Sequence, residues 1–128
     1  IDFDPAETIK HLLLGDASHN IYDTHVIEVR DHNVLIAAGI FDYGKNSIAG
    51  ILNFYHPAYK KYSLGKYLML LKIIHAQAMG KHWYYPGYIV KDFPKFDYKL
   101  FAGKSAAELY LQESSSWHSY LNMEAKDL

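Results

Sequence analysis

The 128-residue chain contains no cysteine, and several other features are scarce. Without cysteine the chain cannot form disulfides, bind a metal through thiolates or use a cysteine nucleophile. No apolar run reaches the ~18 residues that a membrane-spanning helix needs, so we expect no membrane partner. The formal net charge is only -1, which argues against a protein that coats DNA or RNA through its overall charge. We therefore expect no DNA partner, although a local basic patch is compatible with this composition.

The composition is that of a folded protein with an excess of tyrosine. Hydrophobic residues make up 50% of the chain and charged residues 21%, which argues against disorder. The length fits one domain with a real core, so we expect residues 1–128 to form a single domain. The 12 tyrosines combine a large contact area with a polar tip, which suits cores and binding clefts alike.

Apolar patterning predicts an alternation of strands and helices. Four strands are expected, at residues 21–30, 34–42, 48–55 and 82–90, the last broken near Pro86-Gly87. Helices are expected from Asp4 to Gly15, over residues 64–79 and over residues 93–101.

The helix over residues 64–79 carries the clearest signals. Ser63 is predicted to cap its start through the side-chain hydroxyl, and Gly80 to end it in the left-handed conformation. Its predicted apolar face consists of Leu64, Tyr67, Leu68, Leu71, Ile74, His75 and Ala78. A helix of this kind between two strands favours a parallel crossover. The whole order resembles an α+β fold, an N-acetyltransferase-like mixed sheet flanked by helices.

Three lysines surround the start of this helix, namely Lys60, Lys61 and Lys66, which we call the basic cluster. A helix N-terminus is the positive end of the helix dipole, so cations there are unfavourable unless an anion binds. The backbone N–H groups of Ser63, Leu64 and Gly65 could hold a phosphate or carboxylate with the basic cluster. The alternative is an ordinary helix start with three solvated lysines.

Five ordered motifs carry a family resemblance that runs from about Val34 to Phe101. They are Asn53-Phe54-Tyr55-x-Pro57, Tyr62-Ser63-Leu64-Gly65-x-Tyr67, Gly80, Tyr84-Tyr85-x-Gly87-Tyr88-Ile89 and Pro94-Lys95-x-x-Tyr98-Lys99. Together they resemble the C-terminal domain of arginyl-tRNA–protein transferases and their bacterial leucyl-transferring relatives. The resemblance implies a cytoplasmic enzyme without a cofactor that moves an amino acid from aminoacyl-tRNA to a protein N-terminus. The acceptor implied is an Asp or Glu α-amine, and the product is marked for degradation.

The chain also departs from this family pattern. It has His56 where the family usually has Asp, Pro86 where it has leucine, and Phe93 where it has a small residue, often Cys or Ser. The family's N-terminal cysteine-rich domain has no counterpart among residues 1–128.

The resemblance directs attention to the loop before the long helix. His56 is the only side chain there with a reference pKa near neutrality, so it is the candidate base, with Tyr55 as a proton relay. The alternatives are an exposed loop histidine and a tyrosine that packs the strand end. The histidines lack paired ligand spacing, and no metal is expected.

The remaining motif residues are candidates for substrate binding. Tyr84, Tyr85 and Tyr88 could stack on the terminal adenine of tRNA, or simply belong to the core. Lys95 and Lys99 could contact tRNA phosphates or an acidic acceptor, or form a solvated face. The family motifs add Tyr67, Gly87 and Tyr98 to the substrate-binding set. An acyl-coenzyme A N-acyltransferase and a non-catalytic relative that binds tRNA or a protein N-terminus remain open, although the single-glycine turn Tyr62–Tyr67 disfavours coenzyme A.

Overall fold

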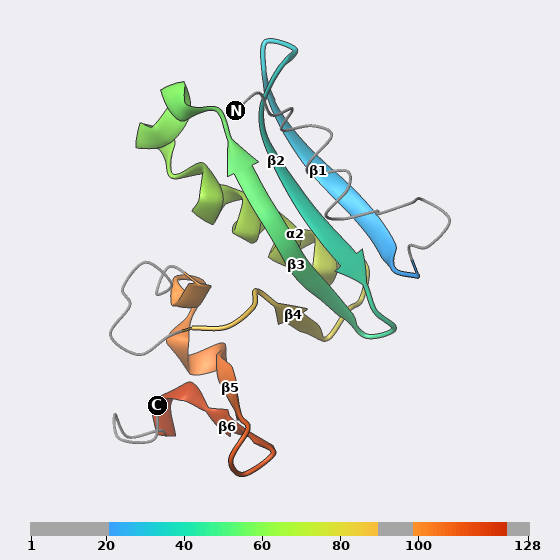
Figure 1. The fold of residues 1–128 in the computed structure, drawn as a ribbon, viewed down its shortest axis with the longest axis vertical. Coiled ribbons are helices and arrows are strands. Elements are labelled where there is room, and N and C mark those ends of the chain that lie inside the picture. Colours follow the sequence, from blue (N-terminus) through green and yellow to red (C-terminus); the bar gives the residue numbers. More distant parts are fainter. Residues whose placement is uncertain (1–20, 90–98, 123–128) are drawn as a thin grey trace, which may run out of the picture.

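The computed structural model describes residues 21–89 and 99–122 (Figure 1). The helix predicted from Asp4 to Gly15 lies outside the described residues. So does most of the helix predicted over residues 93–101, including Phe93, Lys95 and Tyr98.

A four-stranded mixed sheet forms the centre of the structure, in the order β1-β2-β3-β4. Strands β1 (Asp23–Asp31), β2 (Val34–Tyr43) and β3 (Ser47–Tyr55) pair antiparallel, while β4 (Trp83–Tyr85) pairs parallel with β3. The sheet and its helix confirm the predicted α+β class. The strands also lie close to the predicted ranges, except for β4.

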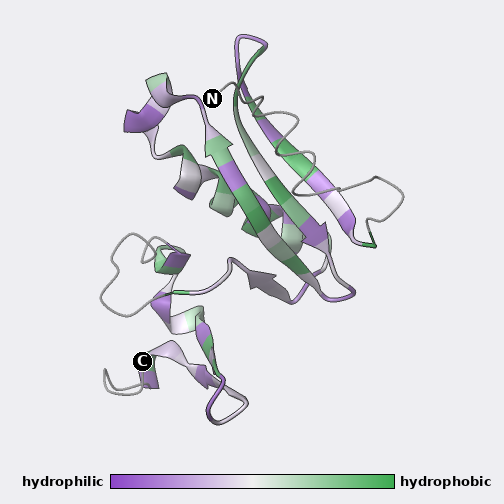
Figure 2. Ribbon diagram, viewed as in Figure 1, coloured by the Kyte–Doolittle hydropathy of each residue, from purple (hydrophilic) through white to green (hydrophobic). Residues whose placement is uncertain are grey.

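The first β hairpin follows from local sequence. His32 and Asn33 connect β1 to β2 with positive φ values of 46° and 69°, a conformation that asparagine tolerates better than most residues. Residues 36–41 of β2 are buried on both faces, as the continuous apolar run predicted. The central strands and the long helix accordingly carry most of the hydrophobic colour in Figure 2.

Helix α2 (Leu64–Ala78) connects β3 to β4 and lies against one face of the sheet (Figure 1). A short 3₁₀ helix, η2 (Pro57–Tyr62), precedes it. Because β4 returns beside β3 in the parallel direction, the predicted crossover is confirmed. Gly80 has φ 69°, which confirms the predicted left-handed residue after the helix.

The buried face of α2 differs from the predicted one. Tyr67 and Ile74, predicted as apolar-face residues, are 44% and 50% exposed. The buried residues instead follow an i, i+4 row, with one neighbour, and are Leu64, Leu68, Met69, Lys72 and Ala76. This row meets the sheet at Gly39, which has no Cβ and so leaves room for the side chain of Lys72 in the core.

Strand β4 is shorter than the predicted strand over residues 82–90. It ends at Tyr85, because Pro86 has no N–H for the ladder and Gly87 has a φ of 109°. A second sheet follows, the hairpin of β5 (Glu108–Leu111) and β6 (Ser116–Ser119), flanked by η4 (Lys104–Ala106) and η5 (Tyr120–Asn122). The ring of Trp117 on this hairpin lies 5.9 Å from that of Tyr85.

Within the described residues, no helix is both long enough and apolar enough to cross a bilayer.

Candidate functional site

His56 caps the short helix η2 at the end of β3. Its Nδ1 accepts a hydrogen bond of 3.1 Å from the backbone N–H of Ala58. A backbone N–H can only donate, so the ring proton of neutral His56 must sit on Nε2. The accessible nitrogen is therefore a donor, and His56 can act as a base only by giving up this cap. The aspartate that the family resemblance places at this position could accept the same bond.

Ser63 does not cap α2 through its hydroxyl, contrary to the sequence prediction. It occupies the N-cap position, but its φ of 53° and ψ of 47° are left-handed, and its side chain makes no capping bond. A residue at an N-cap normally has extended dihedrals, which aim its oxygen at the first-turn N–H groups. The tight passage from η2 into α2 forces Ser63 out of that region, so its hydroxyl bonds no first-turn N–H.

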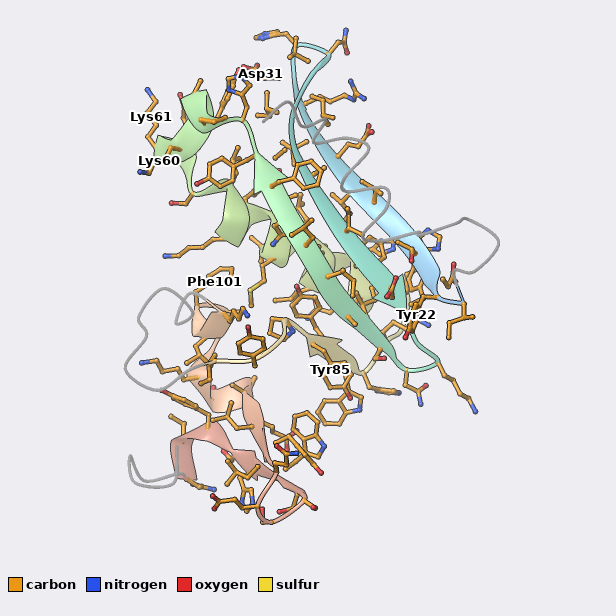
Figure 3. The ribbon with its side chains drawn as sticks, viewed as in Figure 1. Tyr22, Asp31, Lys60, Lys61, Tyr85 and Phe101 are labelled. Atoms are coloured by element: carbon orange, nitrogen blue, oxygen red, sulfur yellow. The ribbon has the colours of Figure 1, made fainter. Side chains whose placement is uncertain are left out.

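The basic cluster lies on the surface around this helix start. Lys60 and Lys61 project outward from η2 (Figure 3), and all three lysines are exposed. Among the described residues none of the three forms a salt bridge, and α2 has no acidic residue in its first turn. A Cβ added at Gly65 would meet nothing within 4 Å, so there is open space beside this residue of the first turn. These features are compatible with a bound anion, and the anion site stays a prediction.

The η2 turn is fixed to the first hairpin at two points, the first being a 2.7 Å backbone bond from the N–H of His56 to the carbonyl of Ile36 on β2. The hydroxyl of Tyr59 donates a 2.8 Å hydrogen bond to Asp31 at the end of β1. This bond and the nearby carboxylate raise the pKa of Tyr59. The basic cluster is consequently held in place relative to the sheet.

Of the three tyrosines predicted to stack on adenine, the structure exposes two. Tyr85 is 39% and Tyr88 70% exposed, whereas Tyr84 packs against the core cluster beside α2. Tyr84 therefore lies on the core side of β4, and the two exposed rings remain candidates for stacking.

Lys99 is committed to the loop after β4 rather than free for a ligand. Its Nζ donates a 2.8 Å bond to the carbonyl of Tyr88 and lies 5.2 Å from the centre of that ring. A Cβ at Gly87 would come within 3.1 Å of the same amine. Burial lowers the pKa of Lys99. Lys99 and Gly87 thus shape this loop together, and the contact of Lys99 with tRNA stays a prediction.

Strands β3 and β4 part soon after they meet. Their ladder consists of Ser47↔Trp83, Ile48↔Tyr84 and Ala49↔Tyr85, and β3 then continues alone on this side to Tyr55 (Figure 1). Among the described residues, the edge of β3 beyond Ala49 has no strand partner there. An unpaired edge offers backbone donors and acceptors to a ligand.

Lys72 is a polar residue of this region that the sequence analysis missed. Its side chain is 1% exposed, beneath β2 and β3. Its Nζ donates to the carbonyl of Ile40 at 3.0 Å and to Oδ1 of Asn53 at 2.7 Å. Burial lowers its pKa from 10.5 to about 8. The only signal in the sequence is Gly39 in the facing strand β2, where a Cβ would come within 2.9 Å of Cε of Lys72.

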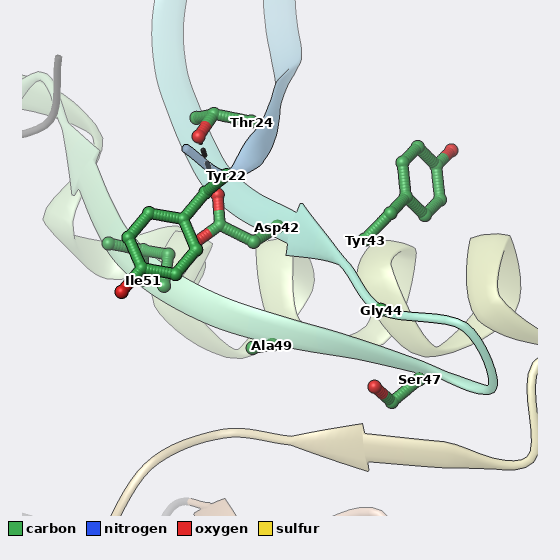
Figure 4. Close-up of a pocket in the computed structure, with 8 residues that line it drawn as sticks. All are labelled: Tyr22, Thr24, Asp42, Tyr43, Gly44, Ser47, Ala49 and Ile51. Atoms are coloured by element: carbon green, nitrogen blue, oxygen red, sulfur yellow. Dashed lines mark hydrogen bonds between the residues drawn. The ribbon is translucent and has the colours of Figure 1, made fainter. Parts of the chain in front are cut away.

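A separate open cleft of about 540 Å³ lies on the face of the sheet away from α2 (Figure 4). It is lined by the start of β1, the end of β2 and the start of β3, and Thr24 donates a 2.6 Å bond to Asp42 within it. None of the predicted site residues lines this cleft.

No cluster of three or more histidine, aspartate or glutamate side chains in residues 21–89 and 99–122 could hold a metal ion.

Comparison with known proteins identifies the family of the β3–η2–α2–β4 unit. Residues 5–105 match the family described as "Arginine-tRNA-protein transferase, C terminus". The chain belongs to this family. The match includes all of the β3–η2–α2–β4 unit and confirms the resemblance drawn from the motifs, whereas the β5–β6 hairpin lies beyond it.

Curated relatives of this transferase family match about half of the chain. An aspartate/glutamate leucyltransferase of Hyphomonas neptunium is 43% identical over 65 residues, 51% of this chain and 26% of the relative. Proteins of the same name from Saccharophagus degradans and Aeromonas hydrophila are 36% and 33% identical over 77 and 73 residues. Those matches cover 59% and 57% of this chain, and 33% and 31% of the relatives. The chain therefore spans a third or less of the length of these relatives.

Proposed function

We propose that the protein transfers an amino acid from aminoacyl-tRNA to the N-terminal α-amine of an acceptor protein that begins with Asp or Glu. The observation that carries this proposal is the β3–η2–α2–β4 unit, which lies within the family match and carries the basic cluster just after the end of β3. The acceptor class follows the names of the leucyltransferase relatives. Charged tRNA and such N-termini meet in the cytoplasm, where we place the reaction.

The reaction needs little covalent chemistry from the protein. An aminoacyl ester is already activated, and an N-terminal α-amine has a reference pKa of about 7.7–8.0, so much of it is neutral near pH 8. Holding the two reactants in line supplies a large part of the acceleration. No cysteine or other covalent nucleophile is required, in keeping with the composition.

The described residues suggest separate roles in binding the parts of the two substrates. The basic cluster and the first N–H groups of α2 receive phosphates of the tRNA acceptor end. The exposed rings of Tyr85 and Tyr88 offer stacking surfaces for an unpaired base. His56, one residue beyond β3, presents Nε2–H as a donor. An Asp or Glu acceptor brings a negative side chain, which the basic cluster also favours.

The direct test is a transfer assay. Purified protein is incubated with tRNA charged with labelled Leu or Arg, and with peptides that begin with Asp, Glu or Gly and are otherwise identical. We expect label on the Asp and Glu peptides, little on the Gly peptide and none on an N-acetylated control. Tight binding of charged tRNA without any transfer would favour the non-catalytic alternative, and transfer from an acyl-coenzyme A would favour the acyltransferase.

A further inference from the structure

The contact between Lys72 and Asn53 fixes which way the Asn53 amide points. A lysine ammonium has three donors and no acceptor, so only the carboxamide oxygen can face it. The 2.7 Å bond from Nζ therefore assigns Oδ1 to the buried side and Nδ2 to the opposite side. The orientation follows from chemistry, because the reversed amide would place two donors against each other.

The outward-facing Nδ2 is available to a ligand. Asn53 is half-buried, and its Nδ2 has no partner among the described residues. No buried side-chain nitrogen or oxygen in those residues lacks a partner, so Nδ2 must be accessible to solvent. Asn53 lies on β3 beyond Ala49, where β4 has already left the sheet. Its two N–H bonds are thus fixed donors beside the unpaired strand edge.

The surroundings of Lys72 are built to hold this arrangement. A Cβ at Gly39 would approach Cε of Lys72 to 2.9 Å and Oδ1 of Asn53 to 3.0 Å, so only glycine leaves room for both. A Cβ at Gly50 would come within 2.7 Å of the Tyr84 hydroxyl oxygen and would lie 3.6 Å from the Lys72 amine, the latter an ordinary contact. The Ile40 carbonyl that receives the second bond lies where the register between β2 and β3 shifts. The two hydrogen bonds of Lys72 and the tight space at Gly39 hold the amine in place, and the amine in turn fixes the oxygen of the Asn53 amide.

We propose that Asn53 donates a hydrogen bond to the ester carbonyl oxygen of the aminoacyl-tRNA, and that Lys72 is the positioning residue that aims it. This inference rests on the proposed transferase function. The acceptor nitrogen attacks the carbonyl carbon, so a C–N bond forms and negative charge develops on the carbonyl oxygen. The C–O bond to the ribose then breaks, and the amine proton ends on the ribose oxygen or in water. A preoriented amide donor stabilises that oxygen in the transition state.

The test compares Asn53→Asp with wild type in the transfer assay. Aspartate keeps an oxygen for Lys72 and so preserves the buried contact, but it has no donor and adds negative charge at the reacting carbonyl. We expect kcat to fall about 10²–10³-fold, the range for loss of one oxyanion donor, with KM for tRNA and peptide little changed. Asn33→Asp, the same exchange at the exposed β1–β2 turn, is the matched control and keeps wild-type turnover.

Two further measurements make the result decisive. Circular dichroism should match between wild type and Asn53→Asp, and the melting temperature should not fall, because the bond to Lys72 is retained and its charge gains a partner. Lys72→Met removes the donor that orients the Asn53 amide, so the amide can rotate. We expect this variant to lower kcat by a smaller factor than Asn53→Asp does.

Wild-type turnover in a folded Asn53→Asp protein would overturn the inference and leave the transferase function standing. A raised peptide KM at unchanged kcat would also overturn it, because Asn53 would then hold the acceptor. A wild-type protein that transfers nothing would overturn both.

Discussion

The buried amine of Lys72 makes the stability of the fold depend on pH. Its pKa is about 8 in the folded protein, against 10.5 without the surrounding structure. Between these values the unfolded chain binds more protons than the folded one, so stability rises as the pH increases. At one pKa unit per 1.36 kcal/mol, a shift of this size implies a gain of about 2–3 kcal/mol in unfolding free energy between pH 7 and pH 10.

Lys72→Met isolates this contribution, because methionine has a similar unbranched chain and no charge. At pH 7 the variant avoids the burial of a charge, but it leaves Oδ1 of Asn53 and the carbonyl of Ile40 without their donor. Each loss is worth about 1–3 kcal/mol, so the stability change at pH 7 is a difference between two opposing terms of similar size. The pH dependence is therefore the informative quantity, and it should be weaker in the variant.

The measurement is urea unfolding of both proteins at pH 7, 8, 9 and 10, followed by circular dichroism. All other titrating groups are present in both proteins, so they cancel in the difference. We expect wild type to gain about 2–3 kcal/mol relative to Lys72→Met over this range, most of it above pH 8. Parallel stability curves would show that Lys72 is not held as a buried amine, and the reasoning on its position would fail.

Other predictions concern the loop, the basic cluster and the glycines. Replacing the basic cluster with alanines should weaken tRNA binding and lower the slope of log K against log salt by about 2–3; an unchanged slope would make the helix start merely structural. His56→Ala should reduce turnover more than tRNA affinity, and His56→Asp should retain more activity because it keeps the cap. Equal turnover of wild type and His56→Ala would show that this histidine takes no part in the reaction. Gly39→Ala should destabilise the fold by about 1–3 kcal/mol through overpacking, while Gly65→Ala, at an open helix position, should not lower the melting temperature.

Patterns that depend on neighbouring residues predicted most of the fold. The apolar runs located β1, β2 and β3, and the spacing in residues 64–79 located α2 together with Gly80 at its end. The parallel crossover followed from short connections between these elements. The predicted range of β4 was too long, because periodicity alone did not show that Pro86 would end the strand.

The candidate site depended on contacts between distant residues and was harder to predict. A lysine in an amphipathic helix is normally expected to face solvent, and it is Gly39, on a strand distant in sequence, that makes room for Lys72 inside. The orientation of Asn53 then depends on that lysine. Ser63 has a good capping side chain, but the backbone path from η2 decided its dihedrals. In each case tertiary geometry outweighed the local preference.

The buried amine also limits how α2 can slide along the sheet. The facing surfaces are made partly of small residues, Ala37, Gly39 and Ala76, which alone would tolerate several alignments. A shift by one residue moves a helix about 1.5 Å along its axis, enough to break both hydrogen bonds of Lys72. We therefore expect one alignment to be selected, and with it the distance between the start of α2 and the free edge of β3. The spacing between a phosphate at the helix start and an ester at that edge would then be set by the two hydrogen bonds of Lys72, together with the contact between Tyr43 on β2 and His75 on α2.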